Sequence, residues 1–109
     1  MSCWRPGSSW SVFASEACGE RLICPNYGLF DRRGNYFVTD SGQWRKRNGR
    51  LLRFTQDGRG ETIGAAFGYA NGLALSANER HLFMVESDAD RVFRVRDDPV
   101  GWRGRAGAA

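Results

Sequence analysis

The sequence has few of the residues that stabilise small cysteine-rich domains or activate a nucleophile. Cys3, Cys18 and Cys24 are an odd number of cysteines without C-x-x-C spacing, so no disulfide framework is predicted. His81 is the only histidine, and it lies where a strand is expected to begin. Because a thiol or serine nucleophile needs a nearby base, we expect the cysteines to be structural or neutral.

Long apolar stretches are also missing. No run of eighteen apolar residues occurs, so no membrane-spanning helix is predicted. The first ten residues, M-S-C-W-R-P-G-S-S-W, lack the apolar segment of a secretory signal. We therefore expect a cytoplasmic location, where thiols stay reduced.

Lysine is nearly absent as well: Lys46 is the only one, and the net charge of +4 comes almost entirely from arginine. The densest basic stretch is W-R-K-R-N-G-R at residues 44–50. Basic side chains beside a tryptophan could contact phosphates and stack on bases, with strongly salt-dependent binding. The stretch lies between two expected strands, however, and the other arginines are interspersed with acidic residues. We therefore predict no nucleic-acid binding.

The chain contains two similar stretches. Residues 26–42 read N-Y-G-L-F-D-R-R-G-N-Y-F-V-T-D-S-G, and residues 71–87 read N-G-L-A-L-S-A-N-E-R-H-L-F-M-V-E-S. Asn26 and Asn71 are 45 positions apart, Asp40 aligns with Glu86 after one extra residue, and R-L-L-R-F at 50–54 aligns with R-V-F-R-V at 91–95. A repeat of about 40–50 residues made of short strands is typical of a β-propeller blade.

The repeat predicts an all-β fold: a partial β-propeller of about two to two-and-a-half four-stranded antiparallel blades. A preceding blade would contribute an outer strand at residues 10–14. We expect a lead-in at 1–19, a first blade at 20–64, an incomplete second blade at 65–96 and an irregular tail at 97–109. The loss of alternation near Asp97 suggests a truncated or shifted reading frame. The strands are expected at residues 28–30, 35–39, 49–54, from 61–63 onward, 72–75, 81–85 and 91–96.

Both copies resemble successive blades of the regucalcin (senescence marker protein), gluconolactonase and luciferin-regenerating-enzyme family. The resemblance covers about residues 20–96, and strictosidine-synthase-like propellers carry similar strings. It implies a six-bladed propeller with calcium or zinc in its central channel. Family members with known activity hydrolyse lactones of sugar acids.

The resemblance also implies two metal ligands, Asn26 and Asn71, because the family's ligands include an asparagine that opens the inner strand of two blades. The remaining ligands are a Glu from the first blade and an Asp from a later blade, which is also the proposed general base. This chain contains neither region, so its catalytic residues stay unknown and we expect little activity from it alone. An asparagine carbonyl suits Ca²⁺, but two neutral oxygens hold a dication weakly.

Other interpretations remain open. Asn-Gly is also a type I′ turn signal, which is the expected role of Asn48-Gly49 and an alternative for Asn71-Gly72. Asp40 and Glu86 end equivalent strands and could act as an acid–base pair, or could anchor loops between blades. The chain could instead be a non-catalytic propeller module that binds a ligand or a protein. Its open blade edges would also allow self-association.

Overall fold

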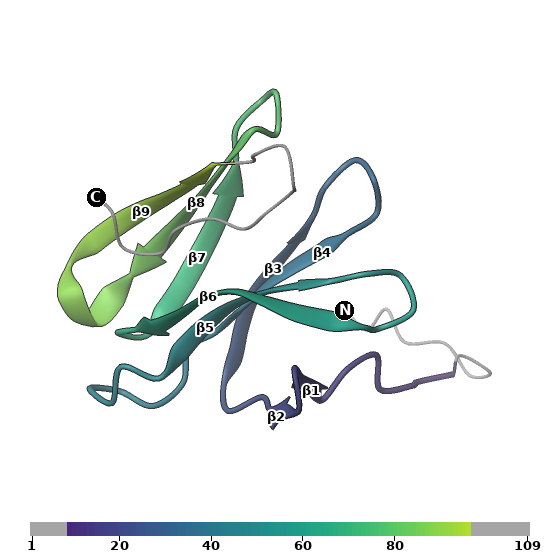
Figure 1. The fold of residues 1–109 in the computed structure, drawn as a ribbon, viewed down its shortest axis with the longest axis horizontal. Coiled ribbons are helices and arrows are strands. Elements are labelled where there is room, and N and C mark those ends of the chain that lie inside the picture. The colour runs from purple at the N-terminus through teal and green to yellow at the C-terminus, as the bar shows by residue number, and fades with distance from the viewer. Residues whose placement is uncertain (1–8, 97–109) are drawn as a thin grey trace, which may run out of the picture.

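The computed structural model describes residues 9–96, and these form three antiparallel sheets with no α-helix (Figure 1). A short hairpin precedes a four-stranded sheet, and a three-stranded sheet follows. The hairpin is β1 (Glu16–Ala17) and β2 (Glu20–Arg21). The four-stranded sheet contains β3 (Pro25–Phe30), β4 (Tyr36–Asp40), β5 (Gly49–Phe54) and β6 (Gly60–Phe67). The three-stranded sheet contains β7 (Ala70–Leu75), β8 (His81–Glu86) and β9 (Arg91–Arg96), with the 3₁₀ turn η1 (Ser87–Ala89) between β8 and β9.

The all-β prediction is therefore confirmed, as sheets of four and three antiparallel strands connected in sequence order correspond to partial propeller blades. Strands β5 and β9 have the predicted bounds, and β4 lies one residue later than predicted. Strands β3, β6, β7 and β8 extend the prediction by a few residues, and the β1–β2 hairpin was not predicted. The predicted tail at 97–109 lies outside the described residues. Within residues 9–96, no helix has the length and apolar character needed to cross a membrane.

Backbone register confirms that the two sheets are equivalent. In the first sheet Phe37 pairs with Leu29 on one side and Arg53 on the other. In the second sheet Phe83 holds the same place, between Ala74 and Arg94. The alignment made from sequence thus describes two copies of one pairing pattern. The further equivalent pairs are Tyr36↔Phe54 with Leu82↔Val95, Val38↔Leu52 with Met84↔Phe93, and Asp40↔Arg50 with Glu86↔Arg91.

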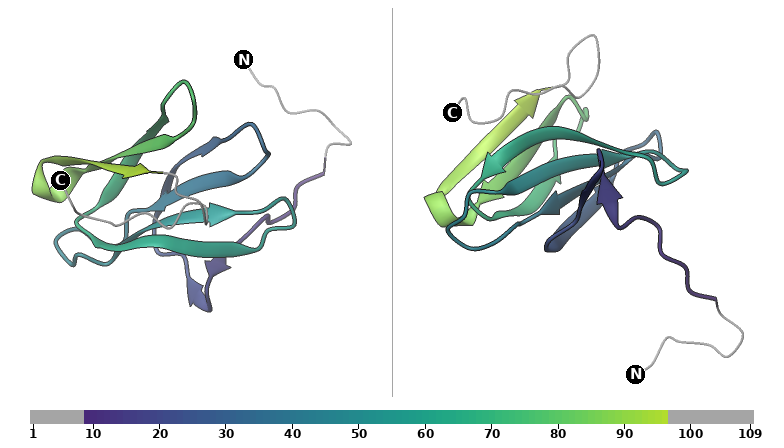
Figure 2. Two further views of the ribbon diagram at one scale, coloured as in Figure 1. Left: turned by 45° about the horizontal axis from the view of Figure 1, so that its top comes forward. Right: turned by 60° about the horizontal axis from the view of Figure 1, so that its bottom comes forward.

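The main core lies between the two sheets, which pack face to face (Figures 1 and 2). Side chains alternate along each strand, so each sheet contributes one set of alternate residues to this core. The first sheet contributes Leu29, Phe37, Leu51, Ile63 and Phe67. The second sheet contributes Ala70, Leu73, Leu75, Leu82, Met84, Phe93 and Val95.

The opposite face of the first sheet is covered by the chain that precedes it. Val38, Leu52 and Phe54 form a second, smaller core with Ala17 of β1, and Phe13 places its ring edge against that of Phe54. The predicted outer strand at residues 10–14 was wrong, because the first strand begins at Glu16. A lone segment without a neighbouring strand cannot form the ladder of backbone hydrogen bonds that defines a strand.

Candidate ligand-binding edge

Asn26 and Asn71 lie near the start of β3 and β7, the inner strands of the two sheets. These strands lie side by side across the core (Figure 1). The turn interpretation of Asn71-Gly72 is wrong, because both residues lie within β7 and neither has the positive φ that a type I′ turn needs. Asn48-Gly49 is not such a turn either, and the positive φ angles of that loop belong to Gly42, Arg45 and Arg47.

Each asparagine is held by the serine that follows the second strand of its own sheet. Asn26 Nδ2 donates to Ser41 Oγ at 2.9 Å, and Asn71 Nδ2 donates to Ser87 Oγ at 3.2 Å. Among the described residues, neither asparagine Oδ1 accepts a hydrogen bond. The amide nitrogen is thus fixed while the amide oxygen stays available to a ligand.

Ser41 also joins the two sheets. Its buried hydroxyl donates to the carbonyl of Ala70 at 2.5 Å. Ala70 immediately precedes Asn71, so a continuous chain of hydrogen bonds runs from Asn26 through Ser41 to the start of β7. The two asparagines therefore belong to one connected end of the molecule. We call this end, defined by Asn26, Ser41, Asn71 and Ser87, the asparagine edge.

Asp40 anchors the backbone that leads into β3. Its buried carboxylate accepts hydrogen bonds from the amides of Ile23 at 2.9 Å, Cys24 at 2.7 Å and Gly42 at 3.1 Å. The Arg50 guanidinium lies 3.6 Å from it. Arg50 itself donates to backbone carbonyls of the β1–β2 hairpin, at Ala17, Glu20 and Arg21. The carboxylate is thus fully used in holding the chain.

Glu86 plays the same part in the second sheet. It is buried, accepts a hydrogen bond from the Gly68 amide at 2.7 Å, and receives Arg91 Nε at 3.0 Å. Gly68 stands three residues before Asn71, as Ile23 stands three before Asn26. This arrangement supports the loop-anchor interpretation of Asp40 and Glu86, because a general acid or base needs an open path to its substrate.

The sequence did not predict the role of Ser41 and Ser87. In the sequence, Ser41 and Ser87 are 46 positions apart, the same spacing that separates Asp40 from Glu86. A serine that follows an acidic residue at the same position in both copies indicates a hydrogen bond common to both copies. The structure contains this hydrogen bond in both sheets.

The loops beside the asparagine edge bring Cys24 and Tyr69 together. The Cys24 sulfur, hydrogen-bonded to the Tyr69 hydroxyl, raises the pKa of that phenol above its ordinary value of 10.0. Tyr69 also meets the ring of Trp44 edge-on, at 5.1 Å between centroids. Trp44 is 51% exposed, and the Arg45 guanidinium lies 5.8 Å from its ring. This aromatic pair joins the β4–β5 loop to the β6–β7 loop.

The donor set fits a metal site only in part. Asn26 is exposed and Asn71 is half-buried, and among the described residues no hydrogen bond occupies either amide oxygen. Within the part of the chain that the structure describes, no three His, Cys, Asp or Glu side chains are grouped as a metal site would require. Since affinity for a hard dication rises with the charge of its ligands, two amide oxygens make a weak half-site.

Comparison with known protein families agrees with the fold and the repeat. Residues 2–104 match the family model described as the SMP-30/Gluconolactonase/LRE-like region. The chain belongs to this family. A comparison with curated proteins found no match. The family resemblance read from the two repeats is thus confirmed over nearly the whole chain, and membership accounts for the two equivalent blade-like sheets.

Proposed function

We propose that this chain carries part of the ligand-binding edge of a gluconolactonase-like, metal-dependent hydrolase that acts on lactones of sugar acids. Family membership supports the reaction class. The observation that carries the proposal is the repeated arrangement of Asn26 and Asn71, each with its nitrogen fixed by a serine and its oxygen uncommitted. In this account the two amide oxygens are ligands of one divalent cation, calcium or zinc.

A bound cation would act as a Lewis acid toward the lactone carbonyl. The chain's own residues would position it: Ser41 and Ser87 orient the amides, and the hydrogen bond from Ser41 to Ala70 links the end of β4 to the start of β7. The carboxylates that end β4 and β8, Asp40 and Glu86, are occupied by backbone amides and arginines. We therefore expect metal binding without efficient turnover by this chain alone.

A non-catalytic binding module is the second candidate. It is favoured by the same commitment of Asp40 and Glu86, because neither of these buried carboxylates is free to act as an acid or base. This candidate predicts that Asn71→Ala changes neither metal binding nor stability in the presence of metal.

Urea unfolding with and without Ca²⁺ or Zn²⁺ distinguishes the candidates. For a Kd of about 1 mM, about 10 mM Ca²⁺ should raise the free energy of unfolding by about 1.4 kcal/mol. Asn71→Ala should abolish this increase, because half of the site is lost. Asn78→Ala is the matched control, since Asn78 is exposed in the β7–β8 turn and bonds only within that turn. Equal stabilisation of all three proteins would contradict the metal proposal.

A further inference from the structure

The loop between β4 and β5 is closed by its own hydrogen bonds. The backbone amide of Gln43 donates to Asn48 Oδ1 at 2.8 Å, and Asn48 Nδ2 donates back to Gln43 Oε1 at 3.1 Å. The amide of Lys46 donates to the carbonyl of Gln43 at 3.1 Å, which adds a turn inside the loop. The side chains at 44–47 are therefore presented on a fixed backbone. We call this segment, residues 43–48, the tryptophan loop.

The tryptophan loop presents one aromatic ring and three cations. Trp44 is half exposed, and Arg45, Lys46 and Arg47 are exposed. Among residues 9–96, none of these three cations takes part in an ion pair. Arg45 and Arg47 also have positive φ angles of 64° and 52°. Residues other than glycine rarely adopt this conformation, which is concentrated at functional sites. The charge of the loop is thus available to an anion.

Tyr69 connects the tryptophan loop to the asparagine edge. Its ring meets that of Trp44 edge-on, at 5.1 Å between centroids. Its hydroxyl is hydrogen-bonded to the sulfur of Cys24, which lies two residues before Asn26. Its backbone carbonyl accepts a hydrogen bond from the amide of Ser87, a member of the asparagine edge, at 3.2 Å. The exposed indole and the asparagine edge therefore lie at the same end of the molecule.

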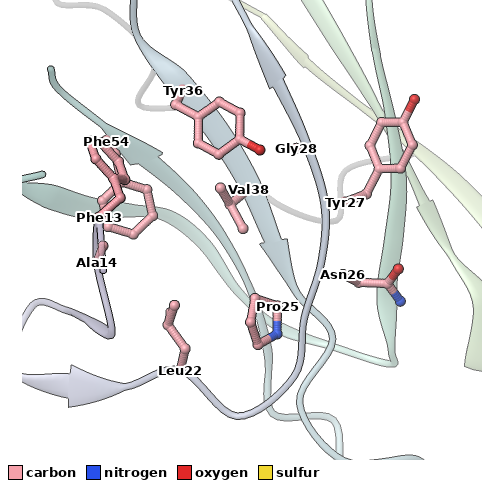
Figure 3. A pocket seen from close by; sticks show the side chains of 10 residues that line it. All are labelled: Phe13, Ala14, Leu22, Pro25, Asn26, Tyr27, Gly28, Tyr36, Val38 and Phe54. Atoms are coloured by element: carbon pink, nitrogen blue, oxygen red, sulfur yellow. The ribbon is translucent and has the colours of Figure 1, made fainter. Parts of the chain in front are cut away.

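The asparagine edge adds uncharged polar groups to this surface. Figure 3 shows the Asn26 side chain pointing away from the rings of Tyr36 and Phe54, in the neighbouring apolar cavity of about 300 Å³. The amide is directed instead toward Ser41, to which its nitrogen donates. Small-molecule sites combine aromatic side chains with a few polar groups that fix orientation. A sugar ring matches this combination, because it has an apolar C–H face for an indole and hydroxyl groups for amide oxygens.

We propose that the tryptophan loop binds a sugar that carries one anionic group, a carboxylate or a phosphate. The sugar ring packs on Trp44, and the anionic group pairs with Arg45, Lys46 and Arg47. Hydrogen bonds between a guanidinium and a carboxylate or phosphate are among the strong ones, because both partners are charged. Binding itself requires neither metal nor turnover. Only the naming of a substrate rests on the proposed function: the lactone would itself carry a carboxylate or phosphate.

The same features favour one sugar over a strand of nucleic acid. Single-stranded nucleic acid is bound by a charged groove that follows the backbone and by aromatic side chains on which successive bases stack. Here the unpaired cations are consecutive residues of one loop, whereas Arg50, Arg53 and Arg91 pair with carboxylates of their own sheets or of the preceding hairpin. One ring and one cluster of charge fit one sugar with one anionic group.

Titrations of the full chain followed by ¹H–¹⁵N correlation spectra test this, with EDTA present and the backbone amides of residues 43–48 as reporters. The probes are glucuronate, glucose-6-phosphate, glucose, inorganic phosphate and an oligothymidylate of about twelve nucleotides. Trp44→Ala removes the ring, and Arg45→Gln removes one charge. Arg33→Gln makes the same charge change in the exposed β3–β4 turn and is the control. All three sites are exposed, so the fold should survive, which circular dichroism checks.

Glucuronate and glucose-6-phosphate should bind at least about tenfold more tightly than glucose or inorganic phosphate, because ring and charge contribute together. Arg45→Gln should weaken both anionic sugars about tenfold, Trp44→Ala should weaken every sugar, and Arg33→Gln should change nothing.

Three results would overturn the proposal: equal affinities for glucuronate and inorganic phosphate, tighter binding of the oligothymidylate than of either anionic sugar, or no shift with any probe. Because EDTA removes metal ions, these results are independent of the proposed metal site. Failure of the metal site would leave sugar binding intact, and failure of sugar binding would leave the response of Asn26 and Asn71 to Ca²⁺ intact.

Discussion

Asp40 and Glu86 make the same connection in two successive sheets. Each carboxylate accepts a hydrogen bond from the backbone amide three residues before the asparagine of its inner strand, and each faces the arginine paired with it on the next strand. The two sheets therefore share the same side-chain hydrogen bonds as well as the same strand order. This connection fixes where each inner strand begins, and hence where its asparagine lies.

Asp40→Asn should destabilise the chain more than Glu86→Gln. Asp40 accepts three backbone amides, whereas Glu86 accepts one and an arginine. Leaving a buried donor unsatisfied costs about 1–3 kcal/mol. We expect a decrease in the free energy of unfolding of about 2–3 kcal/mol for Asp40→Asn and about 1–2 kcal/mol for Glu86→Gln, measured by urea titration at pH 7. Equal and negligible effects would show that the two carboxylates do not anchor the inner strands.

Ser41→Ala and Ser87→Ala form a matched pair. Both remove a hydroxyl bonded to an asparagine, but only Ser41 also donates to a carbonyl of the neighbouring sheet. A net hydrogen bond contributes about 1 kcal/mol. Ser41→Ala should therefore lower the free energy of unfolding by about 1–2 kcal/mol, and Ser87→Ala by less than about 1 kcal/mol. The reverse order in urea unfolding would contradict the bridging role of Ser41.

Gly49→Ala should be far more damaging than Gly72→Ala. A Cβ on Gly49 would lie 2.9 Å from the backbone carbonyl oxygens of Ser41 and Phe67, whereas on Gly72 its nearest contact would be Val85 Cγ2 at 3.9 Å. Backbone atoms cannot yield as a flexible side chain can. We expect a loss of about 1–3 kcal/mol for Gly49→Ala and less than about 0.5 kcal/mol for Gly72→Ala. Thermal unfolding followed by circular dichroism measures both.

The glycines illustrate what sequence could and could not predict. The repeat offsets located the strands and the equivalent residues, because side-chain alternation follows directly from strand geometry. The turn predicted at Asn48-Gly49 was wrong. The same dipeptide also occurs where the backbone of another segment comes so close that only glycine fits. The close approach of Ser41 and Phe67 to Gly49 is a tertiary contact that no local pattern reveals.

The asparagine edge was only partly predictable for the same reason. The positions of Asn26 and Asn71 followed from the repeat and the family resemblance. Their fixation by Ser41 and Ser87 did not, because it depends on which side chains meet where two strands end. The residue pattern of β8 has a similar limit. Residues such as Phe83 and Val85 indicate a buried strand face by pattern, whereas the second sheet leaves that face exposed.

Cys24→Ala should lower the pKa of Tyr69. In the native chain the hydrogen bond to Cys24 and the repulsion between a phenolate and a thiolate favour the neutral phenol, so its pKa is raised above 10.0. A raised phenol pKa means that this contact stabilises the fold below pH 10 and that the stabilisation disappears as pH rises through the folded-state pKa. Absorbance titration at 295 nm should show one tyrosine ionising earlier in the variant. An unchanged titration curve would show that Cys24 does not contact the phenol.

The account's central claim is that Asn26 and Asn71 bind one cation together, and the side-chain amide resonances of the asparagines test it most directly. In a titration with Ca²⁺ followed by ¹H–¹⁵N correlation spectra, the resonances of Asn26 and Asn71 should shift with the same Kd, while those of Asn78 stay unchanged. In Asn71→Ala, the shift of Asn26 should require far more Ca²⁺. If Asn26 and Asn71 do not shift, or if they shift with unrelated midpoints, the two asparagines do not form a shared metal site.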